Sequence, residues 1–233
     1  MAVVQVSRVI KEYRDRGSVP VVALRGVDFA VEAGEFMALA GPSGSGKTTL
    51  LNLIGALDVP THGRVCIDGH DLAGLSATKL ADLRRDRIGF VFQSYNLVPV
   101  LTAAENAEYV MQLRGVPKAE RRKAVAEVFA ALGIADLLDA RPPQMSGGQQ
   151  QRVAVARAIV AGPAVVLADE PTANLDQVTG RALIERMHQL NRERGITFVF
   201  STHDPMVLEQ ADRVVHLVDG QIASDVRKSK REL

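Results

Sequence analysis

A glycine-rich segment between two apolar stretches is the part of the sequence best suited to chemistry. It reads Gly41-Pro42-Ser43-Gly44-Ser45-Gly46-Lys47-Thr48, with the spacing G-x-x-x-x-G-K-[ST]. Residues 36–40 before it are typical of a short buried strand, and residues 49–54 after it of the opening of a helix. In that setting the backbone N–H groups point inward as an anion nest, and the helix dipole adds positive charge. Lys47 can then reach the β- and γ-phosphates, and the Thr48 hydroxyl can bind Mg²⁺. We therefore predict a nucleotide site; the alternative is a glycine-rich turn that happens to contain a lysine.

Two acidic residues directly follow a continuous apolar run at 164–168, which is typical of a strand buried on both faces. They are Asp169 and Glu170. In open parallel sheets the carboxyl ends of the strands face the ligand. Asp169 is the natural Mg²⁺ ligand there, and Glu170 could orient or deprotonate a water molecule. The alternative, two solvated acids at a strand end, is weak because charged residues rarely follow five apolar ones beside a phosphate loop.

A second helix N-terminus could also face an anion. Ser146 can cap a helix that opens with Gly147-Gly148-Gln149, which by itself indicates no more than a capped helix. It does not occur alone, because several motifs follow one another in a fixed order. They are the phosphate loop, Gln93, Ser146-Gly147-Gly148-Gln149, Asp169-Glu170, Leu175-Asp176 and His203.

This ordered set closely resembles the ATP-binding cassette (ABC) ATPases, and the resemblance covers nearly the whole chain. Two departures are small: Met145 replaces the usual leucine before Ser146, and Ala173 stands where glycine or serine is commoner. An apolar exchange of similar volume should be tolerated. Neither departure removes a catalytic group, so the resemblance implies that hydrolysis is intact.

The resemblance implies how ATP is bound. Tyr13 matches the aromatic residue that stacks on adenine, and Gly41 to Thr48 is the Walker A loop. Ser146 to Gln149, hereafter the signature segment, would contact the γ-phosphate held by an opposite subunit. The residues expected to contact the nucleotide are Tyr13, Gly41, Ser43, Gly44, Ser45, Gly46, Lys47, Thr48, Thr49, Gln93, Ser146, Gly147, Gly148, Gln149, Asp169, Asp176 and His203.

The resemblance also assigns the hydrolytic roles. Glu170 is the expected catalytic base, and His203 is the switch histidine at the γ-phosphate. Gln93 lies near Mg²⁺ and the attacking water, Lys47 contacts the phosphates, and Asp176 belongs to the D-loop. The expected metal ligands are Thr48, Gln93 and Asp169. The expected cofactors are ATP and Mg²⁺.

Composition limits the class of protein. The chain has 233 residues, a net charge of +1, 47% hydrophobic residues and a single cysteine, Cys66. Length and hydrophobic content allow a full core, and the charge gives no electrostatic case for nucleic acid. A single cysteine rules out an internal disulfide and suits a reducing compartment. No apolar run approaches the ~20 residues that span a bilayer, and residues 1–8 do not form a signal peptide. We therefore expect a cytoplasmic chain that reaches the inner face of the membrane only through a partner.

The expected fold is α/β: a P-loop NTPase core of the ABC type, with a mixed sheet, an antiparallel β subdomain and an inserted α-helical subdomain. The core would comprise residues 1–92 and 163–233, and the helical insert residues 93–162. Expected strands are 3–11, 21–31, 36–40, 63–69, 88–92, 164–168, 196–201, 213–218 and 221–225. Expected helices begin near 49, 77, 103, 117, 147, 177 and 205, with a polar loop at 13–18 and a charged, mobile tail at 227–233.

The resemblance implies the ATPase subunit of a transporter whose permease is a separate chain. ATP would close a homodimer and hydrolysis would open it. Several segments look most like the lipoprotein-release and macrolide-export branch, so the cargo would be a lipoprotein, macrolide or peptide. Residues 95–109 would line the groove for the permease; Leu97, Val98, Val100 and Leu101 are either an exposed docking patch or packing inside the chain. The main alternative is a cassette of the same branch that signals to cell-wall enzymes without transport. A DNA-maintenance ATPase fits less well, because this sequence lacks a long coiled coil between the phosphate loop and the signature segment. A translation ATPase fits less well, because such chains usually carry two cassettes and this sequence has one. A GTPase fits less well, because the guanine motif Asn-Lys-x-Asp is absent.

Overall fold

A mixed β-sheet carries the predicted chemistry. The chain is described by a computed structural model over residues 2–14 and 20–228. Within them, one six-stranded sheet has the order β10-β9-β3-β8-β7-β6. All neighbours in it run parallel except β10, which pairs antiparallel with β9. Its strands are β3 (Phe36–Ala40), β6 (Ile88–Val91), β7 (Val165–Asp169), β8 (Phe198–Ser201), β9 (Arg213–Val218) and β10 (Gln221–Arg227).

A second sheet is entirely antiparallel and has the order β2-β1-β4-β5. Its strands are β1 (Ala2–Tyr13), β2 (Val21–Glu32), β4 (His62–Ile67) and the short β5 (His70–Asp71), which the sequence pattern did not predict. The mixed sheet, the antiparallel sheet and the helices confirm the predicted fold class.

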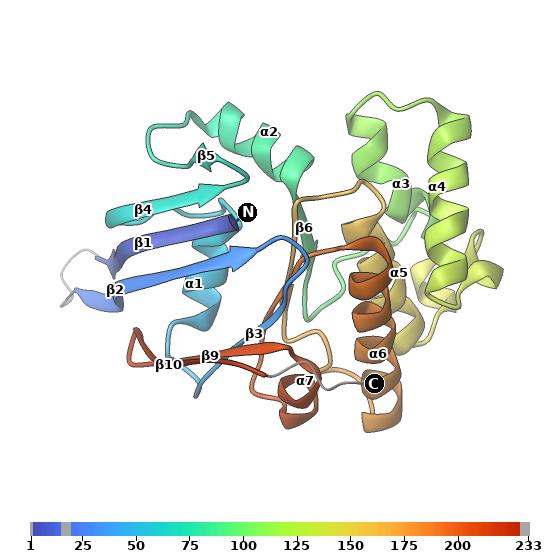
Figure 1. Ribbon diagram of the computed structural model, residues 1–233. Coiled ribbons are helices and arrows are strands. Elements are labelled where there is room, and N and C mark those ends of the chain that lie inside the picture. The colour runs from blue at the N-terminus through green and yellow to red at the C-terminus, as the bar shows by residue number, and fades with distance from the viewer. Residues whose placement is uncertain (1, 15–19, 229–233) are drawn as a thin grey trace.

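The helices begin close to the predicted residues. They are α1 (Lys47–Ile54), α2 (Ala77–Arg87), α3 (Ala103–Leu113), α4 (Lys118–Ala131), α5 (Gly147–Ile159), α6 (Gln177–Arg194) and α7 (Pro205–Gln210), with short 3₁₀ turns at Ala135–Leu137 and Pro142–Gln144. Side chains cap several of them as expected: Thr102 and Ser146 form capping boxes at α3 and α5. Figure 1 shows β1, β2 and β4 on one side of the molecule and α3, α4 and α5 on the other.

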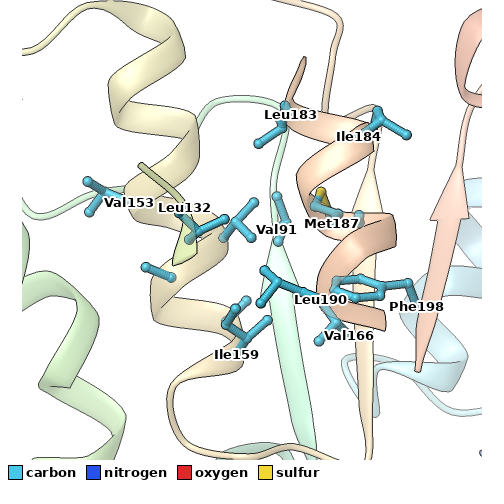
Figure 2. Packing of buried hydrophobic residues seen from close by; sticks show 14 of the residues in the cluster. Val91, Leu132, Val153, Ile159, Val166, Leu183, Ile184, Met187, Leu190 and Phe198 are labelled. Atoms are coloured by element: carbon cyan, nitrogen blue, oxygen red, sulfur yellow. The ribbon is translucent and has the colours of Figure 1, made fainter. Parts of the chain in front are cut away.

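The mixed sheet separates two apolar cores, because alternate side chains of a strand point to opposite faces. On β7, Val165 and Leu167 join a core with α1 and the antiparallel sheet. Val166 and Ala168 face the other way and join a core with α3 to α6. Figure 2 shows this second core, where Val166 and Phe198 of the sheet lie among apolar residues of α5 and α6. The strands that carry the predicted site are therefore held on both faces.

Several predicted strand boundaries differ from the structure by one or two residues. The strand predicted from 196 begins at Phe198, because the Ile196 carbonyl accepts a hydrogen bond from the Asn191 side chain at 2.7 Å. The predicted loop 13–18 and tail 227–233 lie largely outside the described residues. No helix within 2–14 and 20–228 is long and apolar enough to cross a bilayer.

Candidate nucleotide-binding and hydrolysis site

Four adjacent parallel strands bring the predicted residues to one sheet edge. β3, β8, β7 and β6 are neighbours in that order, so their carboxyl ends lie side by side. Ser201 at the end of β8 pairs in register with Leu39 on one side and Asp169 on the other. The phosphate loop follows β3, His203 follows β8, Glu170 follows β7 and Gln93 follows β6. This edge is where ligands bind in open α/β sheets.

The phosphate loop is closed by its own lysine. The ammonium of Lys47 donates to the carbonyl oxygens of Gly41 at 2.7 Å and Pro42 at 2.9 Å. Lys47 is the first residue of α1 and is only 8% exposed. It is held by neutral acceptors, so its charge remains available to an anion at the same loop. Ser43 and Thr48 are exposed beside it and Thr49 is half-buried.

Backbone atoms from distant strands fix the loop. A Cβ atom on Gly41 would lie 2.1 Å from the Leu217 carbonyl oxygen, and one on Gly46 would lie 2.7 Å from that of Ala23. The Gly220 amide also donates to the Ser45 carbonyl at 3.0 Å. The hairpin of β9 and β10 therefore supports the phosphate loop through backbone contacts. The sequence indicated only a turn at Gly220, because backbone contacts leave no side-chain pattern.

Asp169 is a half-buried carboxylate with one unsatisfied oxygen. Its Oδ1 atom is buried and has no hydrogen-bond partner in the described part of the chain, and the hydroxyls of Ser45 and Ser201 are in the same state. Burial raises the pKa of Asp169, and the charge of Glu170 adds to that rise against the opposing influence of Ser201 and Lys47. An unsatisfied carboxylate oxygen is a suitable ligand for a hard cation such as Mg²⁺.

Glu170 and His203 are joined directly. The Nδ1 atom of His203 lies 2.7 Å from Oε1 of Glu170, and the Thr202 hydroxyl donates to Oε2 at 3.2 Å. Glu170 has a positive φ of 45°, which turns its side chain away from the line of β7. The Glu170 side chain is 18% exposed while that of His203 is 75% exposed. A carboxylate oriented by an imidazole, at the edge of a phosphate site, has the geometry of a general base.

Two residues that the sequence analysis missed hold the segment after β6. The side-chain amide of Asn174 donates to the Gln93 carbonyl at 2.9 Å. Arg157 of α5 donates to the carbonyl oxygens of Tyr95, at 2.8 Å, and Asn96. Tyr95 and Asn96 both have positive φ angles, of 59° and 50°. The Gln93 carbonyl is thus bonded to the segment after β7, whereas the carbonyls of Tyr95 and Asn96 are bonded to α5.

The signature segment lies at the N-terminus of α5. Ser146 accepts from the Gln149 amide at 3.3 Å, and its own amide donates to the Gln149 side chain at 2.8 Å. A Cβ on Gly147 would lie 2.8 Å from the Tyr95 hydroxyl, and one on Gly148 would lie 2.5 Å from Thr179. Ser146 is exposed. Helix α5 packs mainly against α3, α4, α6 and β6, and in the described part of the chain no hydrogen bond joins the signature segment to residues 41–49.

The remaining predicted residues lie at element ends. Tyr13 is the last residue of β1 and is 43% exposed. Asp176 caps α6, where its carboxylate accepts from the amide of Thr179 at 2.9 Å and from the Thr179 hydroxyl at 2.7 Å. Those two bonds lower the pKa of Asp176. Asp176 therefore already has a structural task besides any contact with a ligand.

The apolar residues after Gln93 divide between the two predicted alternatives. Leu97 packs on the core beside the helical insert, whereas Val98 and Val100 are 42% and 74% exposed. A cavity of about 300 Å³ opens between β6, α2, α3 and α5 and reaches residues 95–109 at Asn96. Its lining includes Phe90, Phe92, Asn96, Val110, Arg114 and Arg157.

Comparison with known proteins agrees with this geometry. Residues 24–173 match the family model described as ABC transporter. The chain therefore belongs to the ABC transporter family, and it is an ATP-binding ABC ATPase.

Two relatives show which type of ABC cassette this chain resembles. The lipoprotein-releasing system ATP-binding protein LolD of Anaeromyxobacter dehalogenans is 48% identical over 223 residues, covering 95% of this chain and 93% of LolD. The macrolide export ATP-binding/permease protein MacB of Brucella melitensis is 49% identical over 212 residues, covering 91% of this chain. This chain spans only 33% of the length of that MacB. The cassette is thus of the LolD and MacB type.

A solved structure matches the whole fold. The ATP-binding cassette MJ0796, in a dimeric post-hydrolysis state bound to ADP and Pi, superimposes with a TM-score of 0.87. It is 41% identical, and the match covers 96% of this chain and 98% of that one. The predicted family and fold class are confirmed by these comparisons.

Proposed function

We propose that two copies of this chain close around ATP and that the signature segment of each completes the site of the other. The observation that carries this proposal is the position of Ser146. It lies exposed at a capped helix N-terminus, which favours a negative ligand. Its helix packs mainly against α3, α4, α6 and β6 rather than against α1, which begins at the phosphate loop. The dimeric state described for MJ0796 supports the same arrangement here.

Within each site, we assign the roles that the residue chemistry supports. Residues 41–49 hold the phosphates, and Tyr13 stacks on adenine. Mg²⁺ fits the oxygen donors of Thr48, Gln93 and Asp169, whose Oδ1 atom is buried and unsatisfied. The described residues contain no cluster of three His, Cys, Asp or Glu side chains that could hold a metal. A metal that arrives with the phosphates suits such a site better than a cage of protein ligands.

Hydrolysis then depends on the pair Glu170 and His203. Bound Mg²⁺ supplies charge neutralisation at the phosphates. Glu170 accepts the proton of the attacking water, and Gln93 orients that water. The Nδ1 atom of His203 lies 2.7 Å from Glu170, and the other ring nitrogen, Nε2, is the one for the γ-phosphate. Loss of the γ-phosphate removes the ligand that the two copies share, so the dimer opens. Asp176 lies in the D-loop at the same interface.

The cycle drives a separate membrane permease that exports or releases a lipoprotein, macrolide or peptide. The names of LolD and MacB support this cargo class. The cassette would lie on the cytoplasmic face of the membrane through that partner. The cavity beside Phe90 and Phe92, with the exposed Val98 and Val100, supports docking of the permease at residues 95–109.

Mixing two inactive variants tests the shared site. Lys47→Ala removes the phosphate contact, and Ser146→Arg blocks the signature segment. In a mixed dimer both lesions fall on one site and the other site is intact, so hydrolysis should return on mixing. Ser76→Ala is the matched control: Ser76 caps α2 by the same 3.3 Å bond from an amide three residues on, and its loss should leave hydrolysis unchanged. If no mixture ever recovers activity, the shared site is wrong.

A further inference from the structure

Asp58 forms a small polar cluster with the tyrosine at the end of β1. Its Oδ1 atom accepts from the Lys11 ammonium at 2.7 Å, and its Oδ2 atom accepts from the Tyr13 hydroxyl at 3.1 Å. The Lys11 ammonium also donates to the Val59 carbonyl at 2.9 Å and lies 4.9 Å from the centre of the Tyr13 ring. Lys11 is 8% exposed, so its charge is buried in this cluster.

The cluster holds the Tyr13 side chain at its hydroxyl group and at one face of its ring. The hydroxyl is tied to Asp58, and one face of the ring lies beside the Lys11 ammonium at cation–π distance. Tyr13 is still 43% exposed. A tyrosine that served only as core packing would bury its ring. This one is held in a single orientation while much of it remains open to a second flat group.

Asp58 is connected to the phosphate loop along the chain by helix α1. α1 begins at Lys47 and ends at Ile54, and the Leu57 amide bonds back to the Asn52 carbonyl. Asp58 follows directly. The helix that carries the phosphate site at its first residue therefore positions, just past its last turn, the carboxylate that holds Tyr13.

We propose that Asp58 is a positioning residue that sets Tyr13 at a fixed distance from the phosphate loop, so that adenine and triphosphate are recognised together. This inference rests on the proposed stacking of Tyr13 on adenine. The physical gain is preorganisation: a ring already held by Asp58 and Lys11 loses less freedom when the base binds. The charge state of Asp58 agrees with this role. Burial raises the pKa of Asp58, but hydrogen bonds from Lys11, Val59 and Tyr13 together lower it below its ordinary value. Asp58 is thus ionised at neutral pH.

Comparison of two ligands separates this role from a structural one. ATP and inorganic tripolyphosphate share the phosphates, but only ATP carries a base. Asp58→Ala should weaken ATP binding about five- to tenfold, the range expected for one lost aromatic stack and one freed side chain. Its affinity for tripolyphosphate should stay within about twofold of the parent. In steady-state hydrolysis the KM for ATP should rise by the same factor, with kcat unchanged.

Tyr13→Phe keeps the ring and the fold and removes only the bond to Asp58. It should weaken ATP binding about threefold, without effect on tripolyphosphate. Asp71→Ala is the matched control, because Asp71 pairs with Arg64 at 2.9 Å in the same antiparallel sheet and should change neither affinity.

The outcomes distinguish the two proposals. If Tyr13→Ala leaves the ratio of ATP to tripolyphosphate affinity unchanged, the stacking role of Tyr13 is wrong. If Tyr13→Ala lowers that ratio but Asp58→Ala does not, or if Asp58→Ala weakens both ligands equally, the positioning role of Asp58 is overturned while stacking stands. Both affinities are measured by displacement of a fluorescent ATP analogue in the presence of Mg²⁺.

Discussion

Replacing Asp169 by asparagine should make the ligand-free protein more stable. The Oδ1 atom of Asp169 is buried without a hydrogen-bond partner, and a buried polar group left unsatisfied costs about 1–3 kcal/mol. Asparagine has the same shape and removes the charge, but it keeps polar atoms at the site. We therefore expect a gain of about 1 kcal/mol, which is about 2–4 °C in Tm for a chain of this size.

The same substitution should remove the stabilisation that Mg²⁺ adds to a bound nucleotide. A ligand at a hundredfold excess over its Kd contributes about 2.7 kcal/mol, and the metal-dependent share of this needs the ionised Asp169. The assay is calorimetric melting with a non-hydrolysable ATP analogue, with and without Mg²⁺. Glu170→Gln is the matched control: Glu170 already accepts bonds from Thr202 and His203, so its replacement should not raise the ligand-free Tm.

The pH dependence has a definite sign. Burial raises the pKa of Asp169 above its unfolded value. The folded protein therefore binds a proton at Asp169 while the unfolded chain is still ionised, and this group's contribution to stability grows as the pH falls through the raised pKa. The Tm advantage of Asp169→Asn should accordingly shrink between neutral pH and the ordinary carboxyl pKa of about 4. An unchanged or lower ligand-free Tm, together with an intact Mg²⁺ increment, would refute the reasoning.

Three other substitutions test the site. Glu170→Gln should cut kcat by about 10²–10⁴-fold, the usual worth of a general base, while ATP binding and the ATP-bound dimer persist; hydrolysis at the parental rate would exclude Glu170 as the base. Gly41→Ala should weaken nucleotide binding at least about tenfold, because its Cβ meets a carbonyl at 2.1 Å; Gly44→Ala has open space and should cost only about 1–2 kcal/mol of backbone strain. Equal losses of nucleotide affinity in the two glycine variants would contradict the steric account. Arg157→Met should speed amide hydrogen exchange in residues 94–98 at least tenfold, since Arg157 is the donor to two carbonyls there; unchanged exchange would show that the segment is held otherwise.

The sequence alone predicted that the site residues follow strands, but not which strands are neighbours. Asp169 and His203 each follow an apolar run, so their place at a sheet edge could be predicted. The adjacency of β3 to both β8 and β9 could not, because no local pattern records pairing across so many residues. The pairing of β7 with β8 was equally out of reach, and the direct bond between Glu170 and His203 follows from it. The domain limits 1–92, 93–162 and 163–233 and the individual site roles stay predictions.

Contacts made by backbone atoms could not be predicted from the sequence either. Arg157 bonds only to carbonyl groups, which every residue has, so no partner residue type points to it. The support of the phosphate loop by Leu217 and Gly220 is of the same kind. Asp58 is different: it has side-chain partners in Lys11 and Tyr13, but they lie 47 and 45 residues away in the sequence.

The two central charges of the site are kept apart, and this has a consequence for binding. Lys47 donates to two carbonyl oxygens of its own loop, and the Asp169 Oδ1 atom has no hydrogen-bond partner. They attract each other, but no ion pair joins them in the described residues. A direct pair would neutralise both charges, and a ligand would first have to break it. Because no ion pair joins the ammonium and the carboxylate, the magnesium nucleotide that we propose would meet both at once, with the phosphates at Lys47 and the metal at Asp169. Binding would then relieve the unfavourable burial of the Asp169 Oδ1 atom, which accounts for keeping a carboxylate there that destabilises the ligand-free fold.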